Sequence, residues 1–141
     1  HMVPGAAQRL QLLPPACRVV TVAGTNGKGS TVAYLTAMLR GAGHHVGTFT
    51  SPHLVRYNER IRVDGAEAAD ADLIAAFEAI DAARGDITLT FFEYNLLAAL
   101  HVFRQHRVDH AVLEVGLGRR SVARRPACSV RAGRPCCPIR A

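Results

Sequence analysis

The sequence predicts an α/β fold in which helices flank a largely parallel β-sheet. The first indication is an alternation along the chain. Short, apolar and β-branched segments, which are typical of buried parallel strands, alternate with segments of helical periodicity. The second indication is a glycine-rich loop that joins the first of these strands to a helix, as expected for a βα unit of such a sheet.

Length and composition are those of one compact domain. The chain has 141 residues, of which 49% are hydrophobic and 20% are charged, and its formal net charge is +6. No apolar run approaches the ~20 residues that a membrane span needs, and no segment resembles a secretory leader. We therefore expect a cytoplasmic protein without a membrane partner, in which His1 and Met2 are left over from an expression tag.

The positive charge is concentrated at the end of the chain. Residues 119–141 contain seven arginines and no acidic residue and so carry +7, whereas residues 1–118 carry −1. The same segment holds three of the four cysteines and shows neither a helical nor a strand period. The sequence therefore predicts three parts: a tag remnant and lead-in at 1–17, a folded domain at 18–118, and a disordered basic tail at 119–141.

The first half of the folded domain contains three strand-like segments and one helix. Residues 19–23 form a β-branched strand, and residues 30–42 place their apolar side chains at helical spacing. A second strand covers residues 46–50 and is followed by a loop over residues 51–58. Residues 61–63 alternate with charged neighbours, which predicts a strand that is exposed on one face.

The second half contains two helices. We expect Asp70 to be the N-cap of a helix over residues 71–84. Thr90 and Glu93 have the spacing of a capping box, ahead of a helix that ends near Gln105. The buried stripes should be Leu73, Ala76, Phe77 and Ile80 in the first helix, and Phe92, Leu96, Leu100 and Phe103 in the second.

The loop between the first strand and the first helix has the composition of a phosphate-binding loop. Glycines let the backbone approach phosphate oxygens, and the N–H groups at the start of the helix favour an anion. Lys28 supplies positive charge at the β and γ phosphates, and Ser30 supplies a hydroxyl suited to Mg²⁺. Gly29 is an insertion relative to the common G-x-x-x-x-G-K-[ST] spacing. The candidate ATP-binding residues are Thr25, Asn26, Gly27, Lys28, Gly29 and Ser30.

Two further side chains stand where strands end. Glu114 closes a third buried strand over residues 110–115, and Ser51 follows the second strand. Because the C-terminal ends of parallel strands share one edge of a sheet, Gly24, Ser51 and Glu114 should converge on one crevice. Mg²⁺ favours a carboxylate together with hydroxyl, phosphate and water ligands, which this set supplies. A carboxylate at a strand end can equally be a solvated surface residue, so both interpretations stay open.

Four motifs, in this order, resemble the bifunctional dihydrofolate synthase / folylpolyglutamate synthase family of the Mur ligase superfamily. The resemblance covers residues 18–118, and it predicts the P-loop-type central domain of that superfamily, here incomplete. The inserted Gly29 and a serine-proline-histidine loop favour the folate branch over the cell-wall branch. The motifs are TNGKGS at 25–30, TSPHL at 50–54 with NERI at 58–61, FE at 92–93, and EVGLG at 114–118.

The resemblance implies an ATP-dependent amide ligase of folate biosynthesis. Such an enzyme phosphorylates the carboxylate of dihydropteroate or of a folate, and L-glutamate then attacks the acyl phosphate. Lys28 and Glu114 would be the catalytic residues, and Ser30, Ser51 and Glu114 would hold Mg²⁺. The resemblance further implies a full-length protein that is monomeric, and it leaves open whether that protein is bifunctional or only polyglutamylating.

The resemblance places the pterin side of the pocket at residues 90–93, near the loop that contains His53. A structural explanation competes with this assignment, because Thr90 and Glu93 already satisfy a capping box and Phe92 lies on a buried stripe. A histidine beside a proline in a loop is also often only exposed. The candidate substrate-binding residues, for which both explanations stay open, are Thr90, Phe91, Phe92, Glu93 and His53.

The tail departs from the family after Gly118. The family would continue with glycine, arginine, a hydrophobe, aspartate, a small residue and asparagine, whereas this chain continues RRSVARR. Arginine, alanine, proline and cysteine rise together, which is typical of a GC-rich coding sequence translated in a shifted frame; the coding DNA near codon 118 tests this interpretation. The alternatives are an arm that binds nucleic acid and a cysteine-based metal or redox cluster, although the tail lacks interleaved aromatic residues and a zinc spacing.

Two classes of function remain. The first is a folate ligase, here a truncated fragment that binds nucleotide without ligase activity and has no nucleic-acid partner. The second is a non-catalytic protein that binds phosphate or nucleic acid through the glycine loop and the basic tail. A Lys28→Ala variant separates them, because ATP binding depends on Lys28 whereas binding of nucleic acid by the tail does not.

Overall fold

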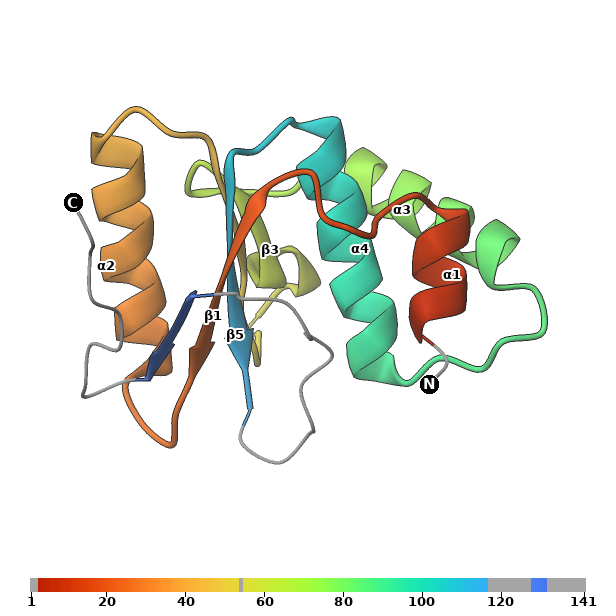
Figure 1. Ribbon diagram of the computed structural model, residues 1–141, viewed down its shortest axis with the longest axis horizontal. Helices are drawn as coiled ribbons and strands as arrows, with labels where there is room; N and C mark the ends of the chain where they lie inside the picture. Colours follow the sequence, from red (N-terminus) through yellow and green to blue (C-terminus); the bar gives the residue numbers. More distant parts are fainter. Residues whose placement is uncertain (1–2, 54, 117–127, 132–141) are drawn as a thin grey trace.

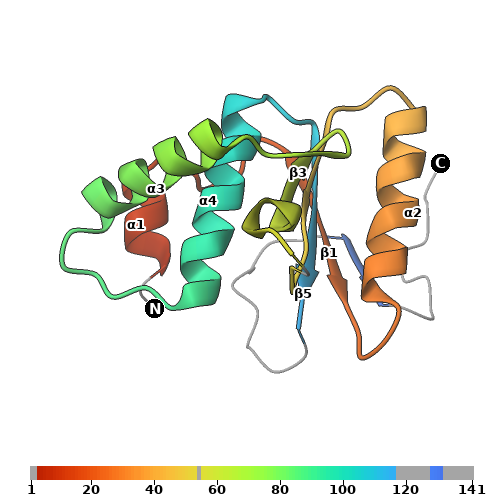
Figure 2. The same cartoon turned by 180° about the vertical axis from the view of Figure 1, so that it is seen from behind.

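Helices cover both faces of one β-sheet in the computed structural model, which describes residues 3–53, 55–116 and 128–131. One face is covered by α2 (Lys28–Gly41), and the other by α4 (Phe91–Gln105). Outside α4 lie α3 (Asp70–Arg84) and α1 (Val3–Arg9) (Figures 1 and 2). The expected α/β fold is therefore confirmed. None of the helices in the described ranges has the length and apolar character needed to cross a bilayer.

The sheet is mostly parallel, as the sequence predicts. Its strands are β1 (Arg18–Ala23), β2 (Val46–Phe49), β3 (Ile61–Val63), β4 (Ala66–Glu67), β5 (His110–Val115) and β6 (Cys128–Arg131). They lie in the order β4-β3-β2-β5-β1-β6. The neighbours β2, β5, β1 and β6 run parallel to one another, and the hairpin of β3 and β4 extends the sheet antiparallel at one edge. All C-terminal ends of the parallel strands therefore share one edge of the sheet.

Helix caps agree with the sequence in α4 and differ from it in α3. Thr90 caps α4, and its side chain accepts a hydrogen bond from the backbone N–H of Glu93. The prediction that Asp70 caps α3 is wrong, because Ala69 occupies that position without a side-chain bond. Asp70 Oδ1 instead accepts a hydrogen bond of 2.7 Å from Nδ2 of Asn58, a buried amide that needs an acceptor.

Two short helices lie in segments for which the sequence predicts no regular structure. The 3₁₀ helix η1 (Tyr57–Arg60) overlaps the expected loop, and α1 lies in the expected lead-in. Ala6 and Ala7 of α1 are fully buried, so this segment belongs to the hydrophobic core. Pro4 and Gly5 obscure the helical pattern in the sequence, although proline is tolerated in a first turn. The supposed tag residues, 1 and 2, lie outside the described residues.

Within the basic tail the structure describes only β6. This strand pairs in parallel with β1, so that Val20 lies opposite Cys128. The expectation of disorder over 119–141 does not hold for these four residues, because the free edge of β1 offers N–H and C=O groups for pairing. The shifted-frame, nucleic-acid-arm and cysteine-cluster interpretations depend mainly on residues 117–127 and 132–141, which lie outside the described part.

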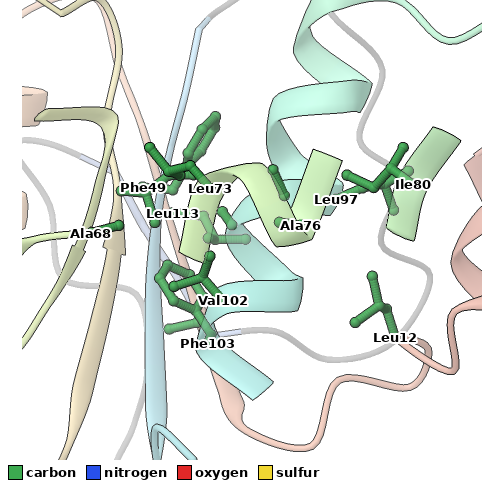
Figure 3. Packing of buried hydrophobic residues seen from close by; sticks show 14 of the residues in the cluster. Leu12, Phe49, Ala68, Leu73, Ala76, Ile80, Leu97, Val102, Phe103 and Leu113 are labelled. Carbon is green, nitrogen blue, oxygen red and sulfur yellow. The ribbon is translucent and has the colours of Figure 1, made fainter. Parts of the chain in front are cut away.

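Helix α4 is buried on more than one side. Leu73, Ala76 and Ile80 of α3 are buried as expected, and Phe77 is partly buried. In α4, however, only Phe103 of the four expected core residues is fully buried; Phe92, Leu96 and Leu100 are partly buried. Because α4 lies between the sheet and the outer helices, two of its faces are enclosed rather than one stripe (Figure 3). Its buried residues are Asn95, Leu97, Ala98, Ala99, His101, Val102 and Phe103.

Strand β2 passes α4 at a position where only glycine fits. A Cβ atom at Gly47 would lie 2.4 Å from Cδ1 of Phe103. Phe103 is 1% exposed, so its ring is surrounded by the core and has little room to move away. The absence of a side chain at position 47 therefore sets how closely the helix approaches the sheet.

We expect Gly47→Ala to lower the free energy of unfolding by about 1–3 kcal/mol, because an added methyl group overpacks this contact. Gly41→Ala, in which the new Cβ meets nothing within 4 Å, should instead stabilise the helical end of α2 by about 0.5–1 kcal/mol. Denaturant unfolding of both variants measures the two changes. Equal stability of the two variants would show that the Phe103 ring adjusts without cost.

A charged pair joins the start of β2 to the turn after β3. His45 Nδ1 lies 2.8 Å from Oδ2 of Asp64, whose Oδ1 accepts a hydrogen bond from the backbone N–H of Val46. The hydrogen bond to Asp64 raises the pKa of His45. Burial alone would raise the pKa of Asp64, but the hydrogen bonds from His45 and Val46 outweigh it and lower that pKa.

These opposite shifts predict a window of pH in which the pair stabilises the fold. The contribution of His45 is complete below its unfolded pKa of about 6.5 and is lost as the pH rises through the raised folded value. The contribution of Asp64 to stability is complete above its unfolded pKa of about 3.9, and it is lost as the pH falls through the lowered pKa of the folded state. Asp64→Asn should therefore destabilise the protein more at pH 5.5 than at pH 8, and should move the pKa of His45 back toward its ordinary value.

An NMR titration of His45 and denaturant unfolding at the two pH values check this prediction. Asparagine tolerates the backbone conformation of Asp64, whose φ is 51°, so the substitution removes charge without adding strain. The matched control is Asp72→Asn, which removes the charge of an α3 residue that pairs with His106. This substitution should leave the titration of His45 unchanged. An unaltered His45 pKa in Asp64→Asn would contradict the assignment.

Candidate functional site

The loop from Gly24 to Gly27 carries the chain from β1 into α2 and leaves the start of that helix open. Gly27 is the N-cap, with φ 73°, a conformation that side chains other than glycine rarely adopt, and no side chain caps the helix. A Cβ atom built at Gly27 or at Gly29 would meet nothing within 4 Å. The first N–H groups of α2 therefore have no side-chain cap, and the backbone at Gly27 and Gly29 is open to an approaching group, as a phosphate-binding cradle requires.

Lys28 folds back over this loop. Its Nζ donates a 3.0 Å hydrogen bond to the carbonyl oxygen of Gly24 and lies 3.9 Å from Oε1 of Glu114. Glu114 is 6% exposed, and its Oε2 accepts a long, 3.4 Å hydrogen bond from the backbone N–H of Ser51. The predicted convergence of the ends of β1, β2 and β5 is thus found. A nearly buried carboxylate held by such long contacts keeps oxygen lone pairs available to a further ligand.

The remaining side chains of the loop are exposed. Thr25, Asn26 and Ser30 make no side-chain hydrogen bond within the described ranges, and Ser30 stands in the first turn of α2. No group of three or more His, Cys, Asp or Glu side chains is arranged to hold a metal among the described residues. A site made of Glu114, serine hydroxyls and phosphate oxygens suits Mg²⁺, which uses few protein carboxylates and keeps several waters.

The other candidate segment begins α4. Thr90 and Glu93 form the predicted capping box: Glu93 Oε2 accepts hydrogen bonds of 2.8 Å from both the backbone N–H and the hydroxyl of Thr90. Phe92 points into the core, where its ring meets that of Phe49 edge-on at 5.9 Å. Phe91, by contrast, is 67% exposed. The structural role predicted for Thr90, Phe92 and Glu93 is therefore present, and Phe91 is the aromatic member of this segment that faces solvent.

His53 belongs to a cluster that the sequence analysis did not resolve. Nε of Arg60 donates a 2.7 Å hydrogen bond to Nδ1 of His53, and the Arg60 guanidinium lies 5.4 Å from the ring centroid of Phe91. Arg60 therefore joins the loop after β2 to the start of α4. Its place in the NERI motif singles Arg60 out in the sequence, but spacing along the chain does not predict a contact with a helix that begins 31 residues later, at Phe91.

All of these residues lie along one edge of the sheet. In Figures 1 and 2 the C-terminal ends of β1 and β5, the start of α2 and the start of α4 lie at the same edge, with the two helices on opposite faces. The edge therefore combines an anion cradle, a buried carboxylate and an exposed aromatic ring beside an arginine. Such a set can hold the phosphates and metal of a nucleotide on one side and a flat ring on the other.

Comparison with known proteins agrees with this arrangement. No family model matches the chain. The dihydrofolate synthase/folylpolyglutamate synthase of Escherichia coli (strain K12) is 54% identical over 114 residues, which are 81% of this chain and 27% of that protein. The structure of E. coli FolC in complex with DHPP and ADP superposes with a TM-score of 0.80 and 52% identity, covering 84% of this chain and 28% of that one.

A second solved structure gives the same result. The bifunctional folylpolyglutamate synthase/dihydrofolate synthase from Yersinia pestis, complexed with AMPPNP and Mn ion, superposes with a TM-score of 0.79 and 51% identity over 83% of this chain and 28% of that one. The chain thus spans about a quarter of the length of the relatives it matches. Over that quarter, half of the residues are identical and the fold is shared, so the chain is similar to one part of the dihydrofolate synthase/folylpolyglutamate synthases.

Proposed function

We propose that this chain is the nucleotide-binding part of an ATP-dependent ligase that joins L-glutamate to dihydropteroate or to a folate. The observation that carries the proposal is the meeting of Lys28, Glu114 and Ser51 where α2 begins. The E. coli structure holds DHPP and ADP, and the Yersinia structure holds AMPPNP and Mn ion. Both proteins share about half of their aligned residues with this chain, which supports ligands of the same classes here.

The phosphates of ATP would lie against residues 25–30. Backbone N–H groups at the open start of α2 donate to the phosphate oxygens, and Gly27 and Gly29 leave room for this approach. Lys28 then exchanges its bond to the Gly24 carbonyl for the β and γ phosphates, a short movement because its Nζ already lies over the loop.

Mg²⁺ would be held by Glu114 with the hydroxyls of Ser51 and Ser30. The donor set fits, because it combines one nearly buried carboxylate with hydroxyls and leaves positions for phosphate and water. When bound, Mg²⁺ supplies positive charge that neutralises the phosphate oxygens. Lys28 lies 3.9 Å from the same carboxylate, so Glu114 also fixes the position of that ammonium group.

The chemistry follows from placing a carboxylate in line with the γ phosphate. A carboxylate oxygen of the pterin substrate attacks the γ phosphorus, and ADP leaves; the amine of L-glutamate then attacks the acyl carbon, and inorganic phosphate leaves. Charge builds on the transferring phosphoryl group, so Lys28 and the N–H groups of the loop contribute by stabilising it. We infer that Thr90, Phe91, Phe92, Glu93 and His53 form the pterin side of the pocket, with Phe91 as the stacking surface.

ATP binding tests the nucleotide site directly. We expect weak, Mg²⁺-dependent binding of ATP by the 141-residue chain, and a roughly ten- to hundredfold loss of affinity in Lys28→Ala, about 1.5–3 kcal/mol, because a charge-assisted contact is removed. Arg84→Ala, which removes an exposed charge on α3, is the matched control and should bind like the parent chain. Titration calorimetry with and without Mg²⁺ measures both; equal affinity in Lys28→Ala would remove Lys28 from the site.

Ligase activity should be absent from the 141-residue chain alone. Holding both substrates near the phosphoryl donor is worth about 7–11 kcal/mol, and this chain spans only a quarter of its relatives. We therefore consider a chimera in which the matched part of this chain replaces the corresponding 114 residues of the E. coli relative. This chimera should form dihydrofolate from dihydropteroate, ATP and L-glutamate.

Glu114→Ala in that chimera should lower kcat by more than about a hundredfold, whereas Glu78→Ala, at an exposed glutamate of α3, should leave it unchanged. Ligation by the isolated chain that is lost in Lys28→Ala would show that the whole machinery lies within these residues.

Glu93 has both a structural and a proposed substrate role, and the two are separable. Glu93→Gln keeps a capping box, so the free energy of unfolding should change by less than about 0.5 kcal/mol, whereas Thr90→Ala should cost about 1 kcal/mol. If the Glu93 charge also contacts the substrate, Glu93→Gln in the chimera should raise KM for dihydropteroate about tenfold. An unchanged KM would leave Glu93 with the helix cap alone.

A further inference from the structure

A cavity lies at the opposite edge of the sheet from the nucleotide site. Its volume is about 700 Å³, and it is bordered by the first residues of β1 and β5 and by the ends of α1, α2 and α4. Because β1 and β5 run from this edge toward the phosphate loop, the whole length of the strands separates the two sites (Figure 1). The volume lies within the range of ligand sites, about 300–1,000 Å³.

The cavity is lined by more positive than negative charge. Arg18, Arg104 and Arg107 line it, and Asp109 is its only acidic residue among those the structure describes. The side chains of Arg18 and Arg107 make no hydrogen bond or ion pair within the described ranges, and the side chain of Arg104 donates to a neutral acceptor, the carbonyl oxygen of Leu10. Asp109 is already engaged, since its Oδ2 accepts a 2.8 Å hydrogen bond from the backbone N–H of His45. The guanidinium groups therefore lack a full set of counter-charges.

A histidine in the wall leaves a buried donor or acceptor unused. Nδ1 of His110 is buried and has no hydrogen-bond partner within the described residues. Burial lowers the pKa of His110, and the charges of His44 and Arg18 lower it further, which is the effect of a positive local potential. The His44 ring lies 4.5 Å from that of His110 and lines the same cavity. An anionic group here would meet positive charge and supply the missing partner.

Two helices, α1 and α4, end at this cavity with a residue other than glycine in the left-handed backbone conformation that glycine usually adopts. After α2, Gly43 has φ 85°, and the N–H groups of residues 43 and 44 close the helix by bonding back to Arg40 and Leu39. The same pair of bonds closes α1 at Gln11 and α4 at Arg107, with φ 54° and 52°. The chain thus places side chains where glycine carries no strain, and both of these side chains line the cavity.

The rest of the lining is apolar. Leu100, Phe103 and Val108 contribute to it from α4 and the turn that follows, and Leu12 and Cys17 contribute from the segment before β1. Guanidinium planes and imidazole rings stack well on flat groups, and the aliphatic side chains favour an apolar body. We propose that this cavity binds a small organic anion, with a flat apolar body and one carboxylate or phosphate group, at a site separate from the nucleotide site.

The test uses 1-naphthoate and 1-naphthyl phosphate as probes, with the neutral 1-naphthalenemethanol for comparison. Titration calorimetry on the 141-residue chain should show that the anions bind at least about tenfold more tightly than the alcohol, and the stronger of the two identifies the preferred acid group. In NMR spectra the probes should shift the amide signals of residues 100–110 more than those of residues 24–30.

Arg107→Gly removes the charge and relieves the backbone, so the variant should unfold at the same temperature or higher and still lose about tenfold in naphthoate affinity. Arg18→Gln should weaken binding to a similar extent, and Arg84→Gln on α3 should not weaken it. Equal affinity for the anions and the alcohol, unchanged affinity in both cavity variants, or shifts centred on residues 24–30 would overturn the proposal. Because Lys28→Ala leaves this cavity intact, failure here is distinguishable from failure of the nucleotide site.

Discussion

The parallel pairing of β1 with β5 is the constraint on which the candidate site depends. The register sets Val22 opposite Glu114, so the chain that leaves β1 turns into the glycine loop beside that carboxylate. Val112, two residues earlier on β5, packs with Val32 of α2, and Glu114 therefore faces the same helix. A slip of one residue would turn Glu114 to the α4 face and leave Lys28 without it. The pairing of two apolar strands thus decides whether a charged pair exists at their ends.

Much of the fold and part of the site follow from the sequence, because the relevant signals are local. β-Branched runs ended by glycine or by a serine-proline break predict the parallel strands, and the capping box predicts where α4 begins. The rule that parallel strands end at one edge of a sheet then predicts that Gly24, Ser51 and Glu114 lie close together. What this rule does not give is distance. The 3.9 Å separation of Lys28 and Glu114 depends on how the lysine side chain folds over the loop.

The features that the sequence did not predict are set by tertiary packing. Helix α4 has no single apolar stripe, because it is enclosed by the sheet on one side and by other helices on the opposite side. Asp70 serves the buried amide of Asn58 rather than its own helix, and no local spacing encodes that partner. The contact of Arg60 with His53 and Phe91 joins segments that only the folded chain brings together. Periodicity reports which residues avoid water, and it does not report which neighbour they meet.

The close approach of α4 to β2 has a consequence for the geometry of the whole edge. One ring near the end of the helix, Phe103, rests on the bare backbone at Gly47, and one ring near its start, Phe92, meets Phe49 of the same strand. With two aromatic contacts on a single strand, the helix can neither slide along β2 nor turn about its axis without breaking one of them. The distance from the anion cradle to Phe91 is therefore determined by the thickness of the sheet and of one aromatic ring. Loop motion can change access to the site, but it leaves this distance the same.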